Sequence, residues 1–135
     1  MIGELKIVTI GQGLHEITHE VQAWVRDSGH GDGLCTVFVR HTSASLAIQE
    51  NADPTARQDL EQWLSRLVPE NDPLYRHTLE GPDDMPAHIK AALTLTSVSI
   101  PVVAGRLALG TWQGLYLWEH RHRGSERTVV LHLGA

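Results

Sequence analysis

The sequence has little of several features that would assign a class of protein directly. It has one cysteine, Cys35, in 135 residues, so an internal disulfide framework is excluded and the surrounding apolar run predicts a buried, inert thiol. No apolar stretch has the length of a membrane span and no signal-peptide segment follows Met1, so we expect a cytoplasmic protein. Basic residues are outnumbered, 11 to 16, and form no patch, which argues against nucleic acid or a membrane surface as a partner.

Motifs of common enzyme classes are also absent. The sequence contains no H-E-x-x-H, no P-loop, no G-x-G-x-x-G and no C-x-x-C. Ser43 and Ser45 follow His41, but no nucleophile elbow surrounds them, so a Ser-His hydrolase is a weak interpretation. Histidine is abundant instead, with nine residues, in a chain whose 41% hydrophobic and 20% charged content is typical of globular proteins. We expect one domain over residues 1–135.

Alternation and helical spacing predict more strands than helices. Strands are expected over residues 4–10, 14–17, 34–40, 95–103, 107–119 and 127–133. Helices are expected with Thr18, Asp53 and Asp84 as their N-caps. Because this order does not alternate as β-α-β, we predict a single-domain α+β fold of mostly antiparallel, β-sandwich-like sheets with about three flanking helices.

The predicted strand that precedes the last one is apolar at both alternating sets of positions. Trp112, Tyr116 and Trp118 share one face, and Leu115 and Leu117 share the other. A small domain has one hydrophobic core, and that core can cover only one of the two faces of a strand. We therefore expect a neighbouring subunit to cover the second face.

The stretch from Glu80 to Lys90 combines carboxylates and an imidazole on a backbone that glycine and proline restrict. Asp83 and Asp84 lie at the start of a predicted helix, and His88 follows Asp84 by four residues, within side-chain reach. Three carboxylates at a helix start would repel a phosphate unless a cation bridged them, so the stretch suits a metal, a cationic ligand or a proton-transfer pair. A capped acidic turn without further function is the alternative, and spacing alone does not decide.

Histidines elsewhere are candidate metal ligands. His41 ends a buried strand, where it could bind a metal, act as an acid or base, or only hydrogen-bond a carbonyl. His120 and His122 share a face of an extended chain, but they need a third ligand, which only His41 or His88 could supply. The segment Gly110-Thr111-Trp112-Gln113-Gly114 offers groups that can hold an oxyanion, which is a weak signal by itself.

Together these segments resemble the YjbQ-like family, whose members are often labelled secondary thiamine-phosphate synthase. The matching segments cover almost the whole chain: His41-Thr42-Ser43-Ala44-Ser45-Leu46, Glu50-Asn51, Asp53-Pro54, Glu80-Gly81, Asp83-Asp84-Met85-Pro86-Ala87-His88-Ile89-Lys90, Gly105-Arg106, Gly110-Thr111-Trp112-Gln113-Gly114 and Glu119-His120-Arg121. The resemblance implies a β-rich α+β domain that forms a homotrimer with its pockets near the subunit contacts. It also implies a divalent metal, Mg²⁺ or Zn²⁺, on His41, His88 and His120, whereas His122 departs from the family pattern and is not counted as a ligand.

The function that the resemblance implies is an enzyme that joins a hydroxymethylpyrimidine diphosphate to a thiazole phosphate and releases diphosphate. The catalytic residues would be His41, Asp83, Asp84, His88 and Glu80, with Mg²⁺ on the carboxylates to neutralise the leaving group. The phosphorylated small-molecule substrate would be bound by Ser43, Lys90, Thr111, Gln113 and Arg121. Two alternatives stay open: a metal-dependent hydrolase with a zinc-type three-histidine site, and a non-catalytic module that binds a small anion.

Overall fold

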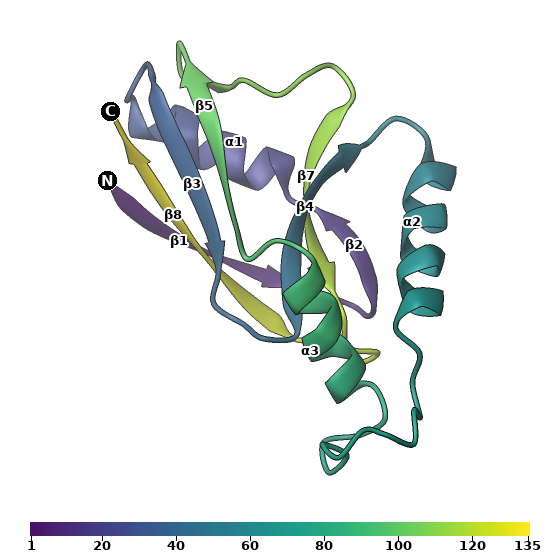
Figure 1. Cartoon of the computed structure of the whole chain (residues 1–135). Coiled ribbons are helices and arrows are strands. Elements are labelled where there is room, and N and C mark those ends of the chain that lie inside the picture. Colours follow the sequence, from purple (N-terminus) through teal and green to yellow (C-terminus); the bar gives the residue numbers. More distant parts are fainter.

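Two antiparallel sheets and three helices make up the structure, a computed structural model that describes residues 1–135 (Figure 1). The larger sheet has the strand order β1-β8-β3-β5-β6, with β1 at Ile2–Val8, β8 at Glu126–Gly134, β3 at Gly33–Val39, β5 at Ser97–Val103 and β6 at Arg106–Leu107. The smaller sheet has the order β2-β7-β4, with β2 at Gly13–Glu16, β7 at Gln113–Glu119 and β4 at Ala44–Glu50. The predicted α+β fold with antiparallel sheets and three helices is confirmed.

The helices connect and flank these sheets. α1 spans Thr18–Ser28, α2 spans Pro54–Leu67 and α3 spans Asp84–Leu93. α2 begins as predicted, because Asp53 Oδ1 accepts a hydrogen bond from the Thr55 amide at 2.9 Å and proline occupies the first helical position. None of the three combines the length and the apolar character that crossing a membrane requires.

The other two helix starts differ from the prediction. Thr18 is the first residue of α1 and does not cap it; its hydroxyl accepts a hydrogen bond from the Leu115 amide at 2.8 Å and so joins the helix to β7. Asp84 is the first residue of α3, and its carboxylate is bound by Arg121 and His88. Both short polar side chains therefore make tertiary contacts in place of the expected caps.

The main core lies between the two sheets and is aliphatic. Val37 on β3, Leu117 on β7 and Leu131 on β8 have no exposed surface there, and Val21 of α1 closes one edge. Cys35 lies in this core without exposure, as predicted, and burial raises the pKa of its thiol to about 11. The thiol therefore stays protonated and unreactive at neutral pH.

α2 covers the opposite face of the smaller sheet, and in Figure 1 it stands beside that sheet, away from β1 and β8. Tyr116 and Trp118 of β7 pack there with Leu64 of α2 in a second core of six buried residues. For Tyr116 and Trp118 the cover is therefore a helix of the same chain and not the expected neighbouring subunit, whereas Trp112 of the same face is 64% exposed. Trp63 and Leu67 of α2 are 52% and 53% exposed and do not belong to this core.

Candidate metal centre at the start of helix α3

The candidate site forms where the loop before α3 returns to the end of β7. Gly81 has a φ of 107°, a conformation that other residues rarely adopt, and a Cβ at this position would lie 3.2 Å from Asp83 Oδ1. The turn brings Asp83 and Asp84 against Arg121, which follows β7 by two residues. Pro86 lies in the first turn of α3, where a missing N–H leaves no hydrogen bond unmade.

Arg121 binds both aspartates. Its Nε donates to Asp83 Oδ2 at 3.0 Å, its Nη1 to Asp84 Oδ1 at 2.7 Å and its Nη2 to the Glu80 carbonyl at 2.9 Å. Burial acts to raise the pKa of both aspartates, but hydrogen bonds and the Arg121 charge outweigh it and hold both pKa values below the usual range. In this arrangement Arg121 is fully engaged by protein oxygens and does not present a free guanidinium to a phosphate.

The second oxygen of Asp84 faces two imidazoles. His77 Nε2 lies 2.8 Å from Asp84 Oδ2, and His88 Nε2 lies 3.1 Å from the same atom. His88 is one turn along α3, whereas His77 belongs to the loop before the helix. The ligand atoms of all three residues lie within 4.8 Å of one another. We call His77, Asp84 and His88 the α3 cluster.

The hydrogen bond on the far side of the His88 ring determines where its proton lies. Nδ1 is 2.8 Å from the Thr42 carbonyl oxygen, which only accepts, so Nδ1 carries a proton. A neutral His88 then turns the lone pair of Nε2 toward an Asp84 oxygen, so that two acceptors face each other. The contact requires a second proton on His88 or a cation between the groups. A metal-bound histidine commonly donates its other N–H to a carbonyl, as His88 does to Thr42.

The other two histidines of the predicted metal site lie apart from the α3 cluster. His41 Nε2 accepts a hydrogen bond from the Thr128 amide at 2.8 Å, and burial lowers the pKa of its ring. His41 and His88 line one surface hollow, whereas the buried His120 lines a different one with Lys90. One chain therefore does not gather the three histidines around a common point. A metal shared by all three would need more than one chain, and it stays a prediction.

Two other predicted substrate-binding residues are remote from the α3 cluster. Gln113 is the first residue of the 7-residue strand β7, Thr111 lies two residues before it, and Arg121 lies two residues after its end, so the length of the strand separates them. At 3.3 Å per residue that separation is roughly 20 Å. The Gln113 side chain is also engaged, because its Oε1 accepts a hydrogen bond from the Gly110 amide at 2.7 Å.

Ser43 belongs to a buried ion-pair network beneath the site. Its Oγ accepts a hydrogen bond from Arg127 Nη2 at 2.9 Å, and Arg127 also pairs with Glu119, which has no exposed surface. Burial acts to raise the pKa of Glu119, but the hydrogen bonds from Arg127 and Thr9 lower it, so the carboxylate is ionised. This network holds the end of β7 in place, and Ser43 contributes one hydrogen bond to it.

His77 is the site residue that sequence reasoning missed. It lies in a polar loop between α2 and α3, where neither helical spacing nor alternation marks any residue. The one available signal was the density of histidine and aspartate between residues 77 and 88. Density does not say which imidazole meets which carboxylate, because the path of the loop decides that.

Fold and site together define a small α+β protein in which two antiparallel sheets pack on each other and a histidine–carboxylate cluster begins the third helix. The chain belongs to the YjbQ-like family: the family model described as UPF0047 protein YjbQ-like matches residues 3–135. The predicted family is thereby confirmed.

Relatives and solved structures agree with this assignment. The UPF0047 protein sll1880 of Synechocystis is 59% identical over 129 residues, which cover 96% of this chain and 88% of the relative. The UPF0047 protein YjbQ of Escherichia coli O157:H7 is 44% identical over 120 residues, or 88% of this chain and 86% of that protein. The crystal structure of the conserved hypothetical protein TT1486 from Thermus thermophilus matches with a TM-score of 0.88 and 39% identity, covering 98% of this chain and 99% of that one.

Proposed function

We propose that this protein is a metal-dependent enzyme that acts on a small phosphorylated molecule, with the metal held by the α3 cluster. The observation that carries the proposal is the close contact of His88 Nε2 and His77 Nε2 with Asp84 Oδ2, which a metal ion would bridge while His88 Nδ1 donates to the Thr42 carbonyl. Two imidazole nitrogens and one carboxylate oxygen suit Zn²⁺ or another first-row transition metal better than Mg²⁺, which prefers oxygen ligands alone.

The residues around the cluster have matching roles. Arg121 binds Asp84 Oδ1 and leaves Oδ2 for the metal, and the Thr42 carbonyl fixes the orientation of the His88 ring. The His77 side chain is 48% exposed, so the cluster opens to solvent on that side. When bound, such a metal supplies a Lewis acid for a phosphate oxygen or lowers the pKa of a bound water.

The hollow beside His88 is the proposed place for the substrate. His41 lines it with its Nε2 engaged by the Thr128 amide, so that the Nδ1 of the neutral ring carries the proton and can donate to a substrate oxygen. Phe38 and Ala92 give the same hollow an apolar wall. A phosphate ester with an apolar or aromatic group fits this combination.

Hydrolysis of a phosphate ester is the reaction that this geometry supports best. A metal with three protein ligands keeps a position open for water, whereas the Mg²⁺-assisted release of diphosphate would need Asp83 as well as Asp84, and Arg121 donates to both oxygens of Asp83. Coupling of a pyrimidine diphosphate to a thiazole phosphate is the second candidate. The Glu80 carboxylate favours it, because this group makes no ion pair in the chain and could stabilise a pyrimidine cation.

We also propose that the working form is a homotrimer with the hollow of His41 and His88 near a subunit contact. Large apolar side chains support this proposal: Phe38 of β3, which lines the hollow, is 45% exposed, and Leu93 and Leu95, which follow the lining residue Ala92, are 60% and 48% exposed. Sedimentation should give three times the 14.9 kDa of the chain. A monomer at all protein concentrations would contradict the proposal.

The test of the enzyme proposal combines metal analysis with two assays on protein purified without a histidine tag. We expect about one equivalent of transition metal in the wild type and loss of the metal in His88→Ala and His77→Ala. His132→Ala, which removes an exposed imidazole of β8, is the matched control and should keep the metal.

The rate of p-nitrophenyl phosphate hydrolysis should be high in the proteins that keep the metal and should be lost in those that do not. Formation of thiamine phosphate from its two precursors, absent in His88→Ala, would identify coupling as the reaction instead. A wild type that binds no metal after incubation with Zn²⁺, Mn²⁺ and Fe²⁺ contradicts the metal-dependent mechanism for both reactions.

A further inference from the structure

Lys90 is a buried lysine without a partner. Its residue is 3% exposed in the last turn of α3, and Nζ makes neither a hydrogen bond nor an ion pair within the chain. No fully buried side-chain nitrogen lacks a hydrogen-bond partner, so Nζ keeps contact with solvent, and an anion could take the place of that water.

The carboxylates nearest to Lys90 are engaged elsewhere. Asp83 is bound by Arg121, and Glu70 contacts the His122 imidazole. No anionic side chain lies within ion-pair distance of Lys90, so its charge is not neutralised from within the chain.

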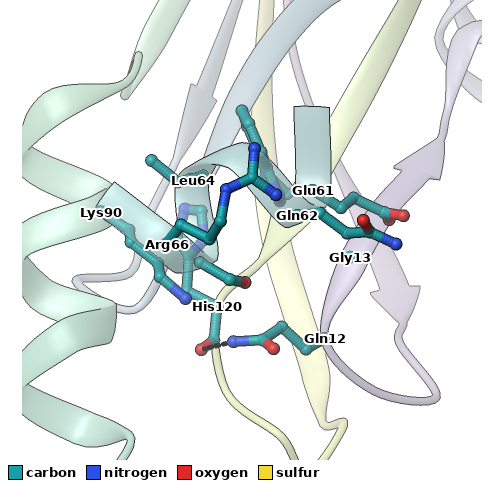
Figure 2. A pocket seen from close by; sticks show the side chains of 10 residues that line it. Gln12, Gly13, Glu61, Gln62, Leu64, Arg66, Lys90 and His120 are labelled. Carbon is teal, nitrogen blue, oxygen red and sulfur yellow. Dashed lines mark hydrogen bonds between the residues drawn. The ribbon is translucent and has the colours of Figure 1, made fainter. Parts of the chain in front are cut away.

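Lys90 Nζ extends into a cavity of about 450 Å³ between α2, α3 and the end of β7, as Figure 2 shows. We call this the Lys90 cavity. Residues 88 and 90 of a helix point about 200° apart at 3.6 residues per turn, so the cavity lies on the face of α3 that is opposite to the hollow of His88. It is a second site, separate from the α3 cluster, and its volume is typical of cavities that bind small molecules.

Two further groups complete the cavity. Arg66, in the last turn of α2, lies at its mouth and makes no ion pair in the chain. His120 forms part of its wall, with Nε2 held by Ser45 Oγ at 2.8 Å and Nδ1 without a partner. The single carboxylate of the lining, Glu61, is engaged at Oε2 by the Leu14 amide at 2.7 Å.

We propose that the Lys90 cavity binds the phosphate group of a small phosphorylated molecule, with Lys90 and Arg66 as its cationic partners and His120 Nδ1 as a neutral donor. A phosphate would supply the acceptors that the Lys90 ammonium lacks, and a guanidinium binds two phosphate oxygens at once. A carboxylate ligand would use the same cations, but it has fewer oxygens than the three donors can engage. The proposal does not depend on the metal, because no residue of the α3 cluster lines this cavity.

The test is calorimetric titration of inorganic phosphate into EDTA-treated protein at constant ionic strength, with acetate in a parallel titration. We expect saturable binding of one phosphate per chain, and at least tenfold weaker binding in Lys90→Met, since a hydrogen bond to a charged group is worth roughly that factor or more. Arg66→Gln should weaken binding severalfold. Lys6→Met is the matched control and should bind as the wild type does, because it removes a lysine that lies on β1 and pairs with Glu4.

His88→Ala, which disrupts the α3 cluster, should bind phosphate unchanged, so a failure of the metal proposal is distinguishable from a failure of this one. If Lys90→Met does not fold, a spectrum of the ¹⁵N-labelled wild type gives the same answer: phosphate should shift the signals of Lys90 and His120 and leave His77 unchanged. Absence of saturable binding at about 10 mM phosphate overturns the proposal. Unchanged affinity in Lys90→Met, or acetate binding as tight as phosphate, overturns it equally.

Discussion

His120 should make the protein lose stability on mild acidification. Burial, assisted by the positive charge of Lys90, lowers the pKa of its ring to about 3 in the folded state, whereas an unfolded histidine has a pKa of about 6.5. Below pH 6.5 the unfolded state therefore takes up a proton that the folded state does not. The stabilisation is complete above pH 6.5 and is lost as the pH falls toward 3, at about 1.4 kcal/mol for each pH unit.

The free energy of unfolding should thus fall by about 2 kcal/mol between pH 7 and pH 5 because of this one side chain. The buried carboxyls do not contribute in that interval: Asp83, Asp84 and Glu119 have lowered pKa values in the fold, and unfolded carboxyls take up protons only near pH 4. His41, whose pKa burial also lowers, is present in the wild type and in a His120 variant, so its effect cancels in the comparison.

The assay is urea unfolding at pH 7 and pH 5 of the wild type, of His120→Gln and of His132→Gln, all at one protein concentration and with EDTA. Glutamine keeps a nitrogen near the position of His120 Nε2 and can still bond Ser45, but it does not titrate. Between pH 7 and pH 5, the free energy of unfolding of the wild type and of His132→Gln should fall by about 2 kcal/mol more than that of His120→Gln. Equal losses in all three proteins would refute the assignment of His120 as a neutral, buried imidazole.

Three further predictions follow from other parts of the fold. Glu119→Gln leaves the Arg127 guanidinium buried without its counter-charge and should lower the free energy of unfolding by about 3 kcal/mol in urea titrations; a change under about 1 kcal/mol would contradict a dry ion pair. Leu117→Ala removes a fully buried side chain between the sheets and should cost about 3 kcal/mol, whereas Leu74→Ala, on an 84% exposed side chain, should cost little. Cys35 should not react with Ellman's reagent at pH 8 in the native protein and should react fully in urea, so rapid native labelling would contradict its burial.

Much of the fold could be predicted because local patterns and tertiary structure agree over long segments. β3 and β8 are β-branched or aliphatic at alternating positions, and their alternation places one set of side chains in the core. The Asp53-Pro54 start of α2 depends on neighbouring residues alone, so sequence reasoning finds it.

The errors arose where a side chain had two possible uses. Thr18 and Asp84 have the chemistry of helix caps, but a β7 amide engages the first, and Arg121 and two imidazoles engage the second. Likewise β7 is apolar on both faces, which alternation shows, but whether a helix or another subunit covers the second face depends on where α2 packs. Sequence spacing carries no information on that choice.

The types of residue that form the candidate site could be predicted from the sequence, but their arrangement in space could not. Asp84 and His88 were found together because they lie one turn apart on a helix. His77 joins them only through the path of a 16-residue connection between α2 and α3, and Arg121 reaches them from the end of a distant strand. Such contacts between remote segments are set by the assembled fold.

The most direct test of the α3 cluster as a metal centre is anomalous diffraction at the zinc edge from crystals of protein loaded with Zn²⁺. We predict one strong peak per chain, within about 2.2 Å of His77 Nε2, His88 Nε2 and Asp84 Oδ2. A fully loaded crystal with no peak among these three atoms, or with its peak at His41 or His120 instead, would contradict the assignment.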